Sequence, residues 1–293
     1  MKWEGERQSD NIEDRRDQAS GVGGFGLGGR SIGVGSVVIA LVAGAVFGVN
    51  PLTILSLLSG GAPPTTRPAA QAPRAHSPEE ERMKAFVATV LADTEDVWTE
   101  QFRAHGRAYR DPRLVLFRGA TATSCGQGES AMGPFYCPAD EKVYIDLGFY
   151  DILRTRLGAP GDFAQAYVIA HEVGHHVQKL LGVSDKVEAA RNGAGKVKSN
   201  ALSVRLELQA DCYAGIWAHD AQRVKNIVEP GDIDEALNAA SQIGDDTLQR
   251  HERGTVVPES FTHGTSEQRV RWFRQGYDSG DVAHCDTFRA LSL

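Results

Sequence analysis

The sequence has little of several features that define specialised protein classes. Its 293 residues include only 4 cysteines and 12 prolines and contain no internal repeat, which excludes a disulfide-dense miniature protein or a collagen-like chain. No block of lysine and arginine is present and the formal net charge is -7, so a nucleic-acid partner has little electrostatic support. Apolar residues make up 41% of the chain, which is typical of a globular protein.

One stretch near the N-terminus has no ionisable side chain. It extends from Ser31 to Thr66 and contains an apolar, glycine-rich run at residues 31–58. A membrane-spanning helix needs about 20 such residues. No small-residue cleavage site closes the run before Pro51, so we expect an uncleaved transmembrane helix over 31–58 rather than a signal peptide. A flexible glycine- and alanine-rich arm is the alternative, because glycine weakens helices.

The apolar run divides the chain into further segments. Residues 1–30 read as a charged N-terminal tail, residues 59–77 as a proline-rich linker, and residues 78–293 as a domain large enough for its own core. Arginines near a span favour the cytoplasmic side, so Arg15, Arg16 and Arg30 favour a tail inside the cell. We therefore expect a single-pass protein of the cytoplasmic membrane with its domain outside the cytoplasm.

The domain combines many helical patterns with few strands. Ser77, Pro78 and Glu80 form a helix start with a capping box. Alternating or short apolar runs predict strands over 114–117 and 142–147. Further helices are predicted over 163–181, 201–220, 233–243 and 266–275, with Gly182, Gly244 and Gly276 as candidate helix ends. The expected fold class is α+β, rich in helix with a small sheet.

A metal-binding motif lies in the helix predicted over 163–181. His171, Glu172 and His175 spell H-E-x-x-H. Residues four apart share a helix face with Cβ atoms about 5 to 6 Å apart, so both imidazoles can reach one zinc ion. Glu172 then lies beside the metal, where it can deprotonate the water that attacks a peptide carbonyl. The motif also occurs by chance, so further residues must support the hypothesis.

Two carboxylates on the helix predicted over 201–220 provide that support. Glu207 and Asp211 are four residues apart and lie on one face. Catalytic zinc commonly binds two histidines, one glutamate and a water, so Glu207 is the expected third ligand. Asp211 is placed to accept the free N–H of a ligating histidine. Alone, the two acids would fit a solvated helix face; the motif and their apolar neighbours favour the metal.

Four other polar residues have less specific signals. His176 is about 100° around the helix from His175, so we expect it to pack or hydrogen-bond rather than bind metal. His263 precedes a predicted helix and could donate a hydrogen bond to the tetrahedral oxyanion, although a loop histidine is more often simply solvated. Arg269 and Arg271 carry the same ambiguity and are expected to form salt bridges.

The cysteines indicate on which side of the membrane the domain lies. They form no C-x-x-C pair of the kind found in zinc ribbons. Three pairings are possible, and separation along the chain favours Cys125 with Cys137 and Cys212 with Cys285. Two disulfides imply the oxidising side of the membrane. The alternative, four reduced cysteines in a cytosolic domain, requires the opposite topology.

Over nearly its whole length, the chain resembles the neutral zinc metallopeptidase family of bacterial single-pass membrane proteins. The similar stretches are residues 11–16, 125–140, 143–146, 170–176, 207–212 and 262–273. The resemblance implies a zincin-like, zinc-dependent peptidase fold with His171 and His175 as ligands and Glu172 as the catalytic base.

Two further expectations come from related families. In the larger membrane-associated gluzincins, which have a block similar to 207–211, the corresponding glutamate completes the zinc site. They also carry a histidine and an arginine near the site, which supports a catalytic role for His263. In zincins the substrate adds as a strand to a sheet edge beside the active-site helix, and residues 143–147 are the candidate edge.

These observations predict a zinc metallopeptidase that acts on a peptide or protein substrate. The alternative is a non-catalytic, membrane-tethered binding module with a structural or vestigial zinc site. A structural site is closed by four protein ligands, whereas the sequence offers three and an unliganded glutamate, which favours the enzyme. A third hypothesis, a cytosolic metal-binding stress protein, requires reduced cysteines.

Overall fold

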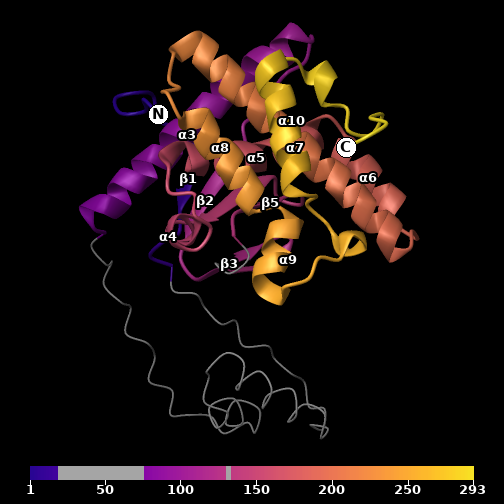
Figure 1. Cartoon of the computed structure of the whole chain (residues 1–293). Coiled ribbons are helices and arrows are strands. Elements are labelled where there is room, and N and C mark those ends of the chain that lie inside the picture. The colour runs from indigo at the N-terminus through magenta and orange to yellow at the C-terminus, as the bar shows by residue number, and fades with distance from the viewer. Residues whose placement is uncertain (19–75, 130–132) are drawn as a thin grey trace, which may run out of the picture. The chain divides into compact units, whose positions relative to one another are not determined.

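The computed structural model describes residues 1–18, 76–129 and 133–293 (Figure 1). The transmembrane helix predicted over 31–58 and nearly all of the linker predicted over 59–77 lie outside these ranges. Within them, no helix is both long enough and apolar enough to cross a membrane.

The described residues form an α+β fold that is rich in helix, as the sequence predicts. The helices are α3 (Pro78–Ala104), α4 (Gly148–Thr155), α5 (Asp162–Leu180), α6 (Val183–Arg191), α7 (Lys196–Lys225), α8 (Asp232–Gln242), α9 (Asp245–Arg253) and α10 (Ser266–Ser279), with short 3-10 turns η2 (Pro258–Ser260) and η3 (Val282–Cys285). The strands are β1 (Ile12–Asp14), β2 (Arg113–Phe117), β3 (Ala120–Thr123), β4 (Gly126–Glu129), β5 (Phe135–Cys137) and β6 (Lys142–Asp146).

The larger sheet has the strand order β1-β2-β6-β5, and β3 and β4 form a separate hairpin. β1, β2 and β6 are parallel, and β5 runs antiparallel to β6. One face of the sheet contributes Leu114 and Ile145 to the core that it shares with the helices. The other face holds a second cluster, in which Tyr144 stacks on Phe135 at 5.0 Å between ring centroids.

The expectation that residues 143–147 form the sheet edge is wrong. β6 lies between β2 and β5, and β5 is the edge strand on that side among the described strands. The alternation of Val143 and Ile145 with Tyr144 suggested one solvated face. Instead both faces of the sheet are covered, so Tyr144 is as buried as its neighbours.

The local helix signals have mixed outcomes. The capping box of Ser77 and Glu80 is present at the start of α3. Gly182 follows α5 with a φ of +73°, as expected for a glycine that ends a helix. Gly276 does not end α10, which continues to Ser279. A Cβ at Gly276 would lie 1.9 Å from the carbonyl oxygen of Cys212, so the glycine is required for close packing of α10 on α7.

Both disulfides join the predicted partners. Cys125 pairs with Cys137, which connects the β3–β4 hairpin to β5, and Cys212 pairs with Cys285, which connects α7 to η3. No free cysteine remains in the described residues. The second disulfide therefore fixes the C-terminal segment directly beside Asp211.

The N-terminal residues are part of the domain rather than a separate tail. Figure 1 shows β1 in indigo beside β2, where Ile12 pairs with Leu114. The side chain of Arg16 is 1% exposed and forms ion pairs with Asp14 and with Glu81 of α3, at 2.6 and 2.8 Å. The predicted separation of residues 1–30 from the domain therefore does not hold for residues 1–18, because their charges have partners within it.

This packing restricts the topology of the chain. Residues 1–18 and 76–293 belong to one compact unit and must share one compartment. A single membrane crossing at 31–58 would separate β1 from β2. The expected arrangement, with the tail in the cytoplasm and the domain outside, stays a prediction from the sequence, and the pairing of these two strands argues against it.

We predict that Arg16→Ala lowers the free energy of unfolding by about 2 to 3 kcal/mol, because it removes a buried guanidinium that serves two carboxylates. Arg82→Ala is the matched control: Arg82 joins α3 to Glu4, but both side chains are 69% exposed, so the cost should be about 1 kcal/mol or less. Chemical denaturation of the full-length protein measures both values. Equal effects would contradict the packing of residues 1–18 into the domain.

Candidate metal centre

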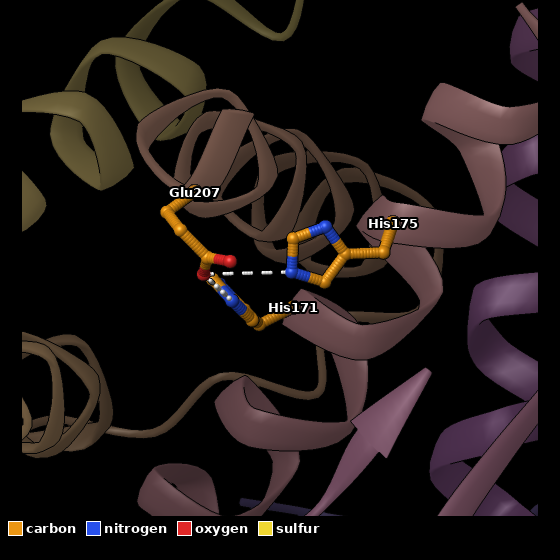
Figure 2. A group of neighbouring side chains, drawn as sticks. All are labelled: His171, His175 and Glu207. Atoms are coloured by element: carbon orange, nitrogen blue, oxygen red, sulfur yellow. Dashed lines mark hydrogen bonds and ion pairs between the residues drawn. The ribbon is translucent and has the colours of Figure 1, made fainter. Parts of the chain in front are cut away.

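Three side chains predicted to bind zinc converge between α5 and α7. Nε2 of His171 and Nε2 of His175 lie 3.1 and 3.5 Å from Oε2 of Glu207 (Figure 2). One potential ligand atom from each residue lies within 4.8 Å of the others. Gly174 permits this approach, because a Cβ at that position would lie 3.1 Å from the carbonyl oxygen of Ala210 on α7.

The donor set fits zinc. Nδ1 of each imidazole, the nitrogen that does not face Glu207, lies near an acceptor. Nδ1 of His171 lies 2.8 Å from Asp211, and Nδ1 of His175 lies 2.8 Å from Oε1 of Gln178. These contacts favour a proton on Nδ1 and leave Nε2 of each ring directed towards Glu207. Two imidazole nitrogens and one carboxylate oxygen are the protein ligands of many catalytic zinc sites.

The electrostatics of this cluster also suit a cation. Burial alone would lower the pKa of His171, but the charge of Asp211 and hydrogen bonds with Asp211 and Glu207 raise it to about 10. Burial opposes ionisation of Glu207 as well, yet the two histidines hold its pKa well below the usual range. Zinc binding requires unprotonated imidazoles, so the ion would replace protons here.

Asp211 occupies the position predicted for it and has more partners than predicted. Its buried carboxylate accepts hydrogen bonds from Tyr167 at 2.5 Å and from two nitrogens of Arg269 at 2.9 Å, in addition to its contact with His171. Arg269 therefore forms the expected salt bridge. Arg271 is exposed and has no ion pair with another residue of the described ranges.

Gln178 was missed by the sequence analysis. It is fully buried, three residues after His175 on α5, and its amide nitrogen donates to the carbonyl of Leu206 at 2.7 Å and to Gln209 at 3.2 Å. Gln209 in turn donates to the carbonyl of Cys285 at 2.9 Å. The available signal was that Gln178 lies three residues after the predicted ligand His175 on the same helix. Many glutamines at such a spacing have other roles, so the signal is not specific.

His176 links α5 to the edge of the sheet. It is fully buried, with Nε2 2.6 Å from the carbonyl oxygen of Arg110 and Nδ1 3.1 Å from the hydroxyl of Tyr136 in β5. The hydrogen-bonding role expected from its helical position fits this geometry. Its contacts hold the edge strand against the helix that carries the metal motif.

The cluster opens into a cleft of about 720 Å³ that also receives Glu172 and His263. Burial raises the pKa of Glu172, although the charges of the two neighbouring histidines oppose this. Asp245 lies 3.1 Å from Nδ1 of His263 and raises the pKa of that imidazole through their hydrogen bond. The side chain of His263 is 48% exposed, so it is accessible from the cleft.

A second group of acidic side chains lies apart from this cleft. Asp162, Asp232 and Glu235 are close enough together to hold a cation. The ammonium group of Met1 lies 2.9 Å from Asp162 and 3.3 Å from Asp232. This ion pairing offsets part of their charge, and the group contains no imidazole, so the zinc hypothesis rests on the histidine cluster.

We predict that Glu207→Ala weakens zinc binding more than Asp211→Asn does. The first change removes a ligand, whereas the second should cost about 10- to 100-fold, as is typical for a group that orients a ligand. Competition with a chromogenic chelator measures zinc affinity, and thermal unfolding verifies the fold of each variant. Full zinc affinity in folded Glu207→Ala would show that the ligand assignment is wrong.

We predict that Gln178→Leu weakens zinc binding by about 10- to 100-fold, because it removes the acceptor that orients His175. Gln178→Glu retains a carbonyl-type acceptor but loses the donor to Leu206, so its zinc affinity should be closer to that of the wild type. The same chelator competition compares the three proteins. Equal losses in both variants would indicate a packing role alone.

Comparisons with known proteins show what the whole chain is similar to. The family model described as "Putative neutral zinc metallopeptidase" matches residues 1–288. The chain is 52% identical to uncharacterized protein YpfJ of Escherichia coli K12, over 98% of this chain and 99% of that protein. It is 46% identical to uncharacterized protein Rv2575 of Mycobacterium tuberculosis, over 63% of this chain and 65% of that protein.

No solved structure matches the chain. The family match, in contrast, covers nearly all of it and includes both β1 and the H-E-x-x-H helix. The E. coli relative matches over the same extent. The chain therefore belongs to the family described as "Putative neutral zinc metallopeptidase".

Proposed function

We propose that this protein is a zinc-dependent peptidase that hydrolyses peptide bonds with Glu172 as the general base. The convergence of two imidazoles and Glu207 at a cleft that also receives Glu172 supports the proposal most strongly. A structural zinc site uses four protein ligands. The histidine cluster in the described residues offers three, which favours an open position for water and argues against a purely structural site.

The roles of the side chains follow from their surroundings. Zinc held by this cluster would supply Lewis-acid activation of water at neutral pH. Glu172 accepts a proton from the attacking water, and its raised pKa brings it closer to the pH at which proton transfer is efficient. His263 reaches the same cleft and can donate a hydrogen bond to the oxyanion.

The sheet provides a place for the substrate backbone. β5 is an edge strand, and residues 134–136 line the cleft beside α5. An extended peptide can add to such an edge through main-chain hydrogen bonds. The combination of a metal-bearing helix with a flanking edge strand supports a zincin-like fold, with β5 in the role first expected for residues 143–147.

The disulfides support an oxidising compartment for the domain. Membrane attachment through residues 31–58 remains a prediction from the sequence. Any such attachment must leave residues 1–18 and 76–293 on one side, because they fold together. We propose that the substrate is a peptide or protein that reaches that side.

We predict that Glu172→Gln lowers peptide hydrolysis by about 10²- to 10⁴-fold while zinc content and thermal stability stay unchanged, because the amide retains the shape but cannot accept the proton. The full-length protein should be used, since residues 1–18 belong to the domain. Cleavage of a synthetic peptide library, mapped by mass spectrometry, gives the rate, and zinc stoichiometry is measured on the same preparation.

A parallel incubation with chelator separates zinc-dependent cleavage from a contaminating protease. Wild-type cleavage by zinc-replete Glu172→Gln would rule out the mechanism. Zinc-loaded wild-type protein that binds peptides of the library without cleaving them would instead support the alternative of a binding module.

A further inference from the structure

The part of the cleft between α4 and the α8–α9 connection has apolar walls. Phe149 and Ile152 project from α4, and Leu248 projects from α9. All three side chains are only partly buried, so they present apolar surface to the cleft. The other apolar residues that line this part are Leu157, Val168 and Ile243.

This apolar part is continuous with the reacting centre. Val168 and Glu172 both line the cleft and are four residues apart on α5, so they lie on one face of that helix. A side chain bound against Val168 would therefore belong to a residue next to the bond that Glu172 acts on. Apolar walls of this kind favour a bulky apolar side chain.

One positively charged side chain lies at the same part of the cleft. Arg156 directly follows α4, lines the cleft and is exposed. Its guanidinium has no hydrogen bond or ion pair with another residue in the described part of the chain. The other cleft arginine differs in this respect, because Arg269 is buried and paired with Asp211. The neighbouring Arg154 also has a partner, Asp151 at 2.8 Å.

We propose that this region is a substrate subsite that takes a bulky apolar side chain, and that Arg156 binds a carboxylate of the same peptide. The proposal rests on the proposed peptidase function and adds a substrate class to it. A guanidinium with all its donors available binds a carboxylate through two parallel hydrogen bonds. Two sources supply this chemistry: an acidic side chain near the scissile bond or the C-terminal carboxylate of the substrate.

Cleavage of matched peptides by the full-length, zinc-loaded protein tests the charge requirement. A library of short synthetic peptides first identifies cleaved sequences. Each is then resynthesised with Asp replaced by Asn, or with an amide at the C-terminus. We expect kcat/KM to fall about 10-fold for one of the two replacements, and that replacement identifies the source of the carboxylate.

Arg156→Gln should remove this discrimination, so that the carboxylate peptide and its amide are cleaved equally. Arg154→Gln is the matched control, because Arg154 is also exposed on α4 but does not line the cleft. It should retain the wild-type preference. Discrimination that survives Arg156→Gln, or its absence in the wild type, would overturn the assignment of Arg156.

The apolar walls need a separate variant. Ile152→Ala keeps the helix but removes much of one wall, so peptides with Leu or Phe beside the scissile bond should lose at least about 10-fold in kcat/KM relative to peptides with Ala there. An unchanged Leu-to-Ala ratio would overturn the apolar subsite.

If zinc-loaded protein cleaves no peptide, the peptidase proposal fails, and the subsite is then judged by binding. Fluorescence anisotropy of labelled library peptides on wild type and Arg156→Gln gives this comparison. A preference for carboxylate peptides that Arg156→Gln removes would support the subsite on a non-catalytic protein. Equal binding of carboxylate and amide peptides would overturn it.

Discussion

The carboxylate of Asp211 is the group on which the site and its surroundings depend. It lies on α7 and accepts hydrogen bonds from Tyr167 and Arg269, and it contacts Nδ1 of His171. Three helices, α5, α7 and α10, therefore meet at one fully buried charge. Removing such a charge from water costs several kcal/mol, which the ion pair with Arg269 and the hydrogen bonds must offset. The orientation of a metal ligand and the packing of the helices are thus set by the same group.

The two histidines are held by chemically different partners. His171 faces a carboxylate that is itself paired with Arg269, whereas His175 faces the neutral amide of Gln178. A carboxylate partner raises the basicity of an imidazole more than an amide does. Glu207, as the third group, adds a carboxylate to the two imidazoles, so the cluster offers a negative charge to a divalent cation.

The features that could be predicted from sequence have local causes. Helical spacing alone brings His171, His175 and Glu172 together, and the capping box at Ser77 is complete within four residues. Asp211 could be predicted because one helical turn separates it from Glu207. In each case the relevant geometry is contained in a single helix.

The features that were missed depend on contacts between distant segments. The alternation in β6 could not show that Phe135 covers Tyr144 on the second face of the sheet. Gly276 resembled a helix end because its actual role, close contact with α7, is invisible within α10. Charged residues around β1 resembled a solvated tail for the same reason, since partners such as Glu81 lie far along the chain.

The position of β1 has a consequence for the order of folding during synthesis. Ile12 leaves the ribosome long before Leu114, with which it pairs, so the first strand made cannot find its place until β2 exists. Pairing of such distant segments carries a large loop-closure cost and is slow. Until β1 and β2 pair, the edges that they present to each other are exposed. Exposed strand edges favour aggregation. The N-terminal strand is therefore synthesised first but stays unpaired until β2 has been made.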